Sequence, residues 1–306
     1  MEKRELAEYI KAEAMNLGLD VCGIARAGSV PEECSGYCNE WIENGRHGTM
    51  QYLERNREKR YNPTLLVEGC KSIVVVAMNY APQKVVEGIS RYAQGLDYHK
   101  VVKDRLFMLL ERIKRVQPAN GRPFCDSAPV LERFWAQEAG IGWIGRNRQL
   151  IIPNKGSYFF LGELLLDIEL EYDTPLRNNF CGNCRRCIDS CPSGALDGSG
   201  FDARRCLSYL TIEYRGELPE NCGKMMNNCF YGCDSCQEAC PHNRFSTPNI
   251  TAELQPLPQL LEMDREKWQA ISKEEYDQLF AHSAVERCGY AQLKRNIEAW
   301  IKAEEQ

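Results

Sequence analysis

The 306-residue sequence has few histidines and no long hydrophobic run. No apolar stretch approaches the ~20 residues that a transmembrane helix requires, and the charged amphipathic start MEKRELAEYIKAEA is unlike a signal peptide. The sequence has no Walker loop and no GxGxxG after a strand, because Gly140, Gly142 and Gly145 follow a predicted helix. These absences predict a cytoplasmic protein without a nicotinamide or nucleoside triphosphate site.

Charge of neither sign dominates the chain. The net charge is -5, and 43% hydrophobic with 26% charged residues is typical of a soluble globular protein. A negative total argues only weakly against a nucleic-acid partner, because phosphate binding depends on local patches. Each candidate basic patch is more commonly a solvated face than a binding site. The patches are Arg55, Arg57, Lys59 and Arg60; Arg146 and Arg148; Arg185 and Arg186; and Arg204 and Arg205.

Cysteine, by contrast, is abundant, with sixteen residues in the chain. One run has the pattern CxxCxxCxxxCP and a later one CxxCxxxCP. In bacterial ferredoxins, three closely spaced cysteines ligate one [4Fe-4S] cluster, and the fourth, before a proline, ligates the other cluster. The spacing therefore predicts two [4Fe-4S] clusters. The cysteines of the two runs are Cys181, Cys184, Cys187 and Cys191, then Cys233, Cys236 and Cys240.

Two clusters need eight thiolates, so one more ligand must lie between the runs, where Cys206, Cys222 and Cys229 compete. We favour Cys206, since FDARRCLSYL predicts the start of a helix, whereas Cys222 and Cys229 fall in a Gly- and Asn-rich stretch that predicts a loop. The crossing rule then assigns Cys181, Cys184, Cys187 and Cys240 to the first cluster and Cys191, Cys206, Cys233 and Cys236 to the second.

Structural zinc and disulfides are the alternative uses of these cysteines. Structural zinc prefers two CxxC knuckles separated by a spacer, and CxxCxxC crowds three ligands onto one turn. Disulfides require an oxidising compartment. Both alternatives are therefore less favoured than two clusters.

The rest of the sequence predicts a mixture of helices and strands. The run SIVVVAMNY, at 72–80, is continuously apolar and β-branched, as expected of a strand buried on both faces. Helices are predicted over 3–17, 40–61, 100–116, from Pro129 onward, 264–281 and 290–304. Further strands are predicted over 20–25, 149–153 and 157–170, the last broken at Gly162.

Several motifs together resemble the epoxyqueuosine reductase family. They are PFCDSAPVLERFWAQEAGIGWIGRNRQLI, GSYFFLGELLLD, CGNCRRCIDSCPSGAL, RCLSYLTIE and GCDSCQEACPHN, in this order over nearly the whole chain. The resemblance implies cobalamin and two [4Fe-4S] clusters as cofactors, with the same eight ligands. It implies reduction of epoxyqueuosine to queuosine in the tRNA anticodon loop, the last step of queuosine biosynthesis. Many members continue into a C-terminal helical-repeat domain that helps hold tRNA, whereas this chain stops at Gln306, which leaves its tRNA contacts open.

The expected fold class is therefore α+β. A cobalamin-binding α/β domain is expected over 1–175, followed by a bacterial-ferredoxin-like two-[4Fe-4S] domain over 176–250 and a C-terminal helical segment over 251–306. The expected partners are tRNA carrying epoxyqueuosine and an unidentified low-potential electron donor. Nothing in the sequence demands an oligomer, so we expect a monomer.

The resemblance implies that Asp126 is the proton donor beside the cobalamin. To donate near neutral pH, its pKa would have to rise well above about 3.9 through burial. Without the resemblance, an aspartate before Ser-Ala-Pro is more simply a helix cap. The resemblance also implies that Ser90, Leu150, Leu161 and Ser208 lie near the corrin, although both leucines are otherwise ordinary core residues.

The histidines lack the DxHxxG context of an imidazole that ligates cobalt, so none of His47, His99, His242 and His282 is expected beneath the metal. His99 either faces the substrate or corrin edge or is structural. Arg133 either contacts the substrate or pairs with a helix neighbour. Two other functions remain open: a cobalamin and iron-sulfur reductase of another small substrate, such as an organohalide, and a zinc-stabilised RNA-binding protein.

Overall fold

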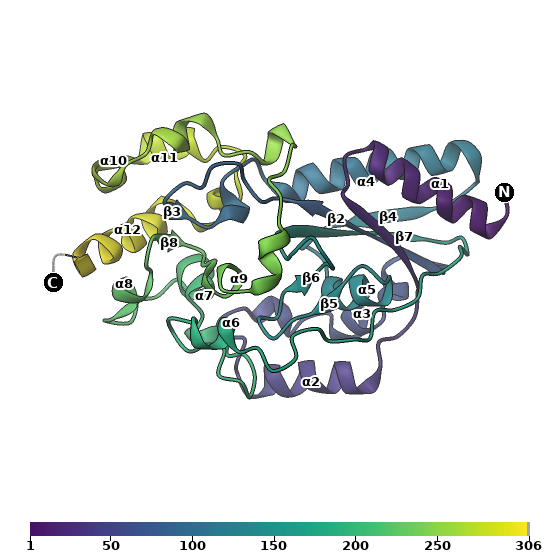
Figure 1. The fold of residues 1–306 in the computed structure, drawn as a ribbon, viewed down its shortest axis with the longest axis horizontal. Coiled ribbons are helices and arrows are strands. Elements are labelled where there is room, and N and C mark those ends of the chain that lie inside the picture. Colours follow the sequence, from purple (N-terminus) through teal and green to yellow (C-terminus); the bar gives the residue numbers. More distant parts are fainter. Residues whose placement is uncertain (305–306) are drawn as a thin grey trace.

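The computed structural model describes residues 1–304 and contains a four-stranded sheet in which every neighbouring pair is antiparallel (Figure 1). The order across the sheet is β1 (Val21–Arg26), β2 (Ser72–Asn79), β7 (Phe159–Leu166) and β4 (Gly121–Phe124). The N-terminal part is therefore mixed α and β, as expected, with antiparallel rather than parallel strands.

Strand β2 is buried on both faces, which confirms the expectation from its apolar run. All eight of its residues are buried. Val74, Val76 and Met78 pack on one face of the sheet, in a core that includes helices α1 (Lys3–Asn16) and α4 (Tyr98–Val116). Ile73, Val75 and Ala77 pack on the other face, against helix α5 (Glu132–Glu138). Figure 1 shows α1 and α4 on one side of the sheet and α5 on the other.

Two predicted helices have different bounds from those expected. The helix over 40–61 is instead α2 (Glu32–Glu43) and α3 (Arg57–Tyr61), separated by turns at Gly45 and Gly48, whose φ angles are 65° and 62°. A side chain at Gly48 would also collide with the hydroxyl of Tyr209. The helix expected from Pro129 begins at Glu132, because residues 125–129 form bends and Leu131 is the N-cap.

The expected break of the strand at Gly162 is wrong. Gly162 lies inside β7 and pairs with Val76 of β2. A Cβ atom at this position would lie 2.7 Å from Val102 Cγ1 and 3.0 Å from Leu106 Cδ1, both on α4. The glycine therefore allows α4 to pack closely on the sheet.

This contact leads to a prediction about stability. We expect Gly162→Ala to lower the free energy of unfolding by about 1–3 kcal/mol, because the added methyl group overpacks the α4 contact. The control is Gly36→Ala in α2, where a Cβ atom meets nothing within 4 Å. The control should raise stability by up to about 1 kcal/mol, since alanine favours a helix. Anaerobic thermal unfolding measures both changes, and an equal effect of the two substitutions would contradict the packing role.

The cysteine-rich segment consists of short elements. Its helices are α6 (Arg186–Asp189), α7 (Leu207–Ile212), α8 (Cys222–Met225) and α9 (Ser235–Glu238). Strand β8 (Cys229–Tyr231) pairs in parallel with β3 (Gly88–Ile89), and β5 (Trp143–Ile144) pairs with β6 (Leu150–Ile151). Short 3-10 helices span Gln51–Leu53, Pro63–Leu66, Arg91–Ala93, Ala203–Arg205, Pro241–Phe245, Ala252–Leu254, Pro258–Glu262 and Ala284–Cys288.

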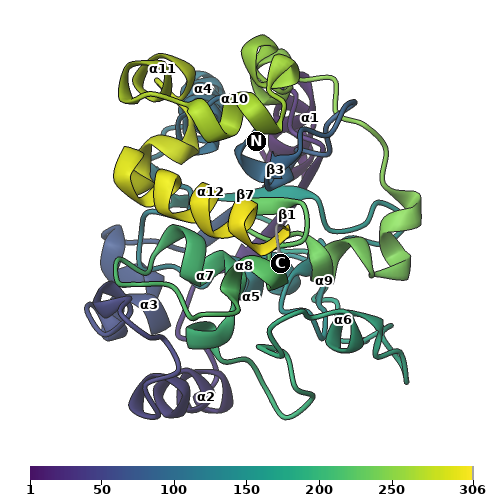
Figure 2. The same ribbon diagram turned by 90° about the vertical axis from the view of Figure 1, so that its left-hand side faces the viewer.

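The C-terminal helices pack on the cysteine-rich segment. Helix α12 (Tyr290–Glu304) lies against α7, α8 and β8 (Figure 2). The predicted helix over 264–281 is two helices, α10 (Arg265–Ala270) and α11 (Lys273–Leu279), because Ser272 and Glu275 form a capping box that starts a new helix. Within residues 1–304, no helix combines the length and apolar character needed to cross a membrane.

Candidate active site and cluster-ligand groups

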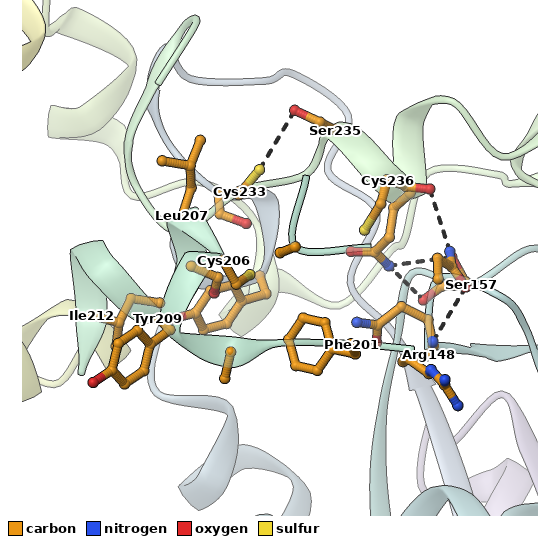
Figure 3. Close-up of a pocket in the computed structure, with 18 of the residues that line it drawn as sticks. Arg148, Ser157, Phe201, Cys206, Leu207, Tyr209, Ile212, Cys233, Ser235 and Cys236 are labelled. Atoms are coloured by element: carbon orange, nitrogen blue, oxygen red, sulfur yellow. Dashed lines mark hydrogen bonds between the residues drawn. The ribbon is translucent and has the colours of Figure 1, made fainter. Parts of the chain in front are cut away.

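A cavity of about 450 Å³ lies between the sheet and the cysteine-rich segment. Its wall includes β7, the start of α4, the loop before α5 and parts of the cysteine-rich segment. Figure 3 shows part of this wall, with Arg148 and Ser157 near Cys236. The structure brings all five non-cysteine site residues suggested by the resemblance to this one cavity: Ser90, Asp126, Leu150, Leu161 and Ser208.

Four of the predicted cluster ligands line the same cavity. Figure 3 shows Cys206, just before α7, and Cys233 and Cys236, in the segment around α9, on the cavity wall, and Cys191 also lines the cavity. A smaller cavity of about 70 Å³ is lined by Cys181, Cys184, Cys187 and Cys240. These two groups of four are the sets given by the crossing rule. We call them the proximal group, at the large cavity, and the distal group.

The competing cysteines lie elsewhere. Cys222 is fully buried at the start of α8, and the Cys229 thiol, in β8, donates to the carbonyl oxygen of Tyr231 at 3.0 Å. The expectation that both lie in a loop is therefore wrong. Cys206 is the N-cap of α7, as the predicted helix start implied.

The electrostatics of the thiols suit a multinuclear centre. Burial raises the pKa of Cys206 to about 11, and burial with the neighbouring thiols Cys233, Cys206 and Cys191 raises the pKa of Cys236. Such thiols become thiolates only when a cation compensates their charge, as iron does in a cluster. Among residues 1–304, no three His, Cys, Asp or Glu side chains converge closely enough to hold a single metal ion. Each group of four instead surrounds a cavity.

Asp126 lines the large cavity and has an uncommon backbone conformation. Its φ angle is 53°, in the left-handed region that aspartate tolerates better than most residues. Its Oδ2 accepts a hydrogen bond from the Tyr98 hydroxyl and lies 3.5 Å from His99 Nε2. The N-cap of α5 is Leu131, so the helix-cap interpretation of Asp126 is wrong.

The protonation of Asp126 differs from the expectation. Burial acts to raise its pKa, but hydrogen bonds from His99 and Tyr98, and the positive charges of His99 and Arg133, outweigh burial and lower the pKa to about 2. The side chain is 53% exposed, which weakens the effect of burial. The expectation of a raised pKa is thus wrong for this structure, because Asp126 is paired with a histidine.

His99 carries the proton of this pair. Its Nδ1 lies 2.7 Å from Asp97 Oδ1 and its Nε2 faces Asp126. Burial acts to lower the pKa of His99, but the bonds to Asp126 and Asp97 raise it to about 9. The His99 ring lines the cavity, which agrees with the interpretation that it faces the substrate or the corrin edge.

The ion pair gives a pH-dependent prediction. Because the pKa of His99 is raised, its ion pair stabilises the fold fully below about pH 6.5, and this stabilisation is lost as pH rises through about 9. Because the pKa of Asp126 is lowered, its carboxylate stabilises the fold above about pH 4, and this stabilisation is lost only as pH falls towards about 2. We therefore expect His99→Gln to cost about 1 kcal/mol at about pH 6, a value discounted for the exposure of Asp126, and almost nothing at about pH 10.5. Anaerobic thermal unfolding at both pH values measures this, and an equal loss at both would contradict the ion pair.

The remaining predicted residues have defined contacts. The Ser90 hydroxyl donates to Asp234 Oδ1 at 2.5 Å, so this group is already used within the protein. Leu150 and Leu161 are buried in β6 and β7. Arg133 lines the cavity and its Nη2 donates to Gln149 Oε1 at 3.3 Å.

The arginines of the candidate basic patches have different surroundings in the structure. Arg148 lines the cavity and its guanidinium lies over the ring of Tyr37. Arg60, by contrast, is buried and donates to the carbonyl oxygens of Leu53 and Tyr52, so it supports a turn. Arg204 pairs with Asp202.

Comparisons with known proteins decide the family. A family described as "Epoxyqueuosine reductase QueG, DUF1730" matches residues 60–127, and a "4Fe-4S double cluster binding domain" matches residues 180–243. An epoxyqueuosine reductase of Leadbetterella byssophila is 42% identical over 304 residues, which are 98% of this chain and 99% of that protein. This chain belongs to the epoxyqueuosine reductase family.

Solved structures of the family agree with the fold. A crystal structure of epoxyqueuosine reductase with a tRNA-Tyr epoxyqueuosine-modified tRNA stem loop has a TM-score of 0.89 at 29% identity, covering 98% of this chain and 81% of that one. A catabolic reductive dehalogenase, NpRdhA, has a TM-score of 0.51 at 18% identity, covering 83% of this chain and 33% of that one, which shows a shared fold alone. The predicted family and its two [4Fe-4S] clusters are confirmed, and the dehalogenase and zinc-protein alternatives are not favoured.

Sequence reasoning missed several residues of this epoxyqueuosine reductase site. Glu132 and Tyr98 line the cavity beside Asp126, and Arg287 reaches it from the C-terminal segment. Tyr98 adjoins the predicted helix start and Glu132 lies within a family motif, so both carried a weak signal. Arg287 is more than 150 residues from Asp126 in the sequence and no local pattern indicates it.

Proposed function

We propose that this protein reduces epoxyqueuosine to queuosine in the anticodon loop of tRNA, using cobalamin and two [4Fe-4S] clusters. The observation that carries the proposal is the single cavity where four cluster-ligand cysteines and the Asp126–His99 pair meet. An electron source and a proton-handling pair therefore lie at one site. Family membership and the tRNA stem loop bound to the structural relative support the substrate.

Each of the three segments of the chain has its own proposed role. Residues 1–175 would bind cobalamin and the modified nucleoside, residues 176–250 would hold the clusters, and the helical segment 251–306 would cover the cluster region. Helix α12 and the buried residues of α7 and β8 share one hydrophobic core, which supports this covering role.

The two cysteine groups suggest an order of electron transfer. The distal cluster would be held by Cys181, Cys184, Cys187 and Cys240, and the proximal one by Cys191, Cys206, Cys233 and Cys236. Because only the proximal group lines the large cavity, electrons from an unidentified low-potential donor would pass from the distal to the proximal cluster. Such clusters reach potentials as low as about -700 mV.

The cavity residues fit cobalamin. The cavity wall combines apolar side chains such as Leu150 and Leu161 with polar ones such as Ser208 and Asn147, and its volume of about 450 Å³ is enough for part of a cobalamin molecule rather than all of it. Apolar surface suits the corrin plane and polar groups suit its amide substituents. His99 is the one histidine among the described residues lining the cavity, and it is already paired with Asp97 and Asp126, which fits a cobalt without a histidine ligand. When bound, cobalamin would supply a strongly reducing cobalt centre.

The protein's own residues would manage protons. Reduction of an epoxide to an alkene consumes two electrons and two protons and releases water. The Asp126–His99 pair holds one proton, which resides on His99 at neutral pH. We propose that Asp126 delivers this proton to the departing oxygen, with His99 as its immediate source and Tyr98 fixing the direction of the carboxyl. This path does not require the raised aspartate pKa expected from the sequence.

The direct test is anaerobic purification with added cobalamin, followed by an assay of queuosine formation on an epoxyqueuosine anticodon stem-loop. The proposal expects about eight iron atoms per chain and conversion of the stem-loop. A preparation with full iron and cobalamin that leaves the stem-loop unchanged but dehalogenates an aryl halide would overturn it.

A further inference from the structure

Glu163 is a carboxyl group buried inside the sheet. It lies in β7 between Val75 of β2 and Phe124 of β4, and none of its surface is exposed. Neither of its carboxyl oxygens has a hydrogen-bond donor among residues 1–304. A buried acid without a donor is strongly disfavoured as an anion, so it must keep its own proton or share one.

The acidic neighbour that acts on Glu163 is Glu132, the first residue of α5. The two carboxyl groups interact electrostatically, and two such groups form a hydrogen bond only when one of them is protonated. Burial and the mutual interaction raise the pKa of Glu163 well above its ordinary value, while burial and Asp126 raise that of Glu132 to about 7. The other charged or titratable groups that act on this pair are Asp126, Arg133, Cys125 and Tyr98.

Glu132 also contacts the candidate proton donor through the backbone. Its Oε1 accepts the N–H of Asp126 at 2.5 Å. Asp126 is the residue with a φ angle of 53°, and its side chain meets Tyr98 and His99. One carboxyl therefore links the rigid interior of the sheet to the loop that carries Asp126.

We infer that Glu132, backed by the buried Glu163, is a positioning residue that holds the Asp126 amide and so directs the Asp126 carboxyl into the cavity. The inference rests on the proposed function for its kinetic test, whereas the contact itself is independent of substrate. Glu163 supplies a fixed neighbour in the sheet, which keeps the Glu132 carboxyl directed at the Asp126 amide. The shared proton removes the repulsion that two buried carboxylates would otherwise have.

The kinetic test compares two substitutions of Glu132. Glu132→Leu removes the oxygen that accepts the Asp126 N–H, and we expect the turnover number to fall about 10²-fold while KM for the stem-loop changes less than about 2-fold. Glu132→Gln keeps an oxygen acceptor and offers an amide donor to Glu163, so turnover should return to within about 3-fold of wild type. The matched control is Glu138→Leu at the end of α5, where the carboxyl pairs with Arg177 instead, and turnover should be unchanged.

A second measurement does not depend on activity. Hydrogen exchange of the free protein should show the amides of 125–131 exchanging about 10-fold faster in Glu132→Leu than in wild type, Glu132→Gln or Glu138→Leu. If the Glu132→Leu variant does not retain iron, Glu132→Ala takes its place in both tests. Alanine removes the same acceptor oxygen and has a smaller side chain than leucine.

The outcomes separate the inference from the proposed function. Unchanged exchange in Glu132→Leu would overturn the inference, and so would a Glu132→Gln variant as inactive as Glu132→Leu, because the acid proton rather than the acceptor oxygen would then matter. Faster exchange in Glu132→Leu, in a protein whose wild type does not convert the stem-loop, would support the positioning contact and refute the proposed function.

Discussion

Asp126→Asn is expected to lower turnover of epoxyqueuosine in a tRNA stem-loop by about 10²–10⁴-fold, the usual contribution of a positioned proton donor. Asparagine has nearly the same shape and also tolerates a left-handed backbone, so the loop should keep its conformation. It cannot carry a proton from His99 to the substrate, and it removes the negative charge that raises the pKa of His99. Single-turnover assays with chemically reduced protein measure the rate of this step.

The control for this substitution is Asp104→Asn on the exposed side of α4, which should leave turnover unchanged. Iron content and cobalamin binding should match wild type in both variants, since Asp126 is not a predicted cluster ligand. Full activity of Asp126→Asn would refute the proton-donor role.

Cys206→Ala is expected to reduce iron from about eight to about four atoms per chain and to abolish turnover. The loss follows from the geometry, because Cys206 lines the large cavity together with Cys191, Cys233 and Cys236, and three thiolates hold a cluster poorly. The proximal cluster should be lost and the distal cluster should remain. Iron analysis and electron paramagnetic resonance of the reduced protein distinguish the two clusters.

Cys229→Ala is the matched control, because Cys229 was a competing candidate and lies in the same segment of the chain. Its thiol donates to the Tyr231 carbonyl and lines neither cavity among the described residues. We expect this variant to keep about eight iron atoms and its activity. Loss of a cluster in Cys229→Ala, with a full complement in Cys206→Ala, would reverse the ligand assignment.

The agreement between sequence and structure is best for the cysteines. Cluster ligation depends on short spacings such as CxxCxxC, which one turn of chain satisfies locally, so the pattern predicts seven ligands without a fold. The eighth needed an argument about local structure, and Cys206 does begin a helix. The same argument was wrong for Cys222 and Cys229, because their stretch of glycine and asparagine is ordered by packing against α12.

The protonation of the site could not be predicted in the same way. The carboxyl of Asp126 was expected to be buried against the corrin, whereas in the protein alone it is half exposed and paired with His99, 27 positions earlier in the sequence. The interaction of Glu132 with Glu163 likewise joins α5 to β7. A pKa depends on groups that meet through the fold, and their sequence separation gives no measure of that distance.

Periodicity and short spacing were thus sufficient for the features that depend on neighbouring residues: the buried strand β2, the helices α1 and α4, and the ferredoxin-like cysteine runs. Features that require distant segments to meet came from packing. These are the place of Gly162 inside β7 against α4, the gathering of the proximal cysteines beside Asp126, and the charge states of Asp126, His99 and Glu163. Backbone hydrogen bonding and ligand spacing act over a few residues, whereas burial and electrostatics are properties of the assembled core.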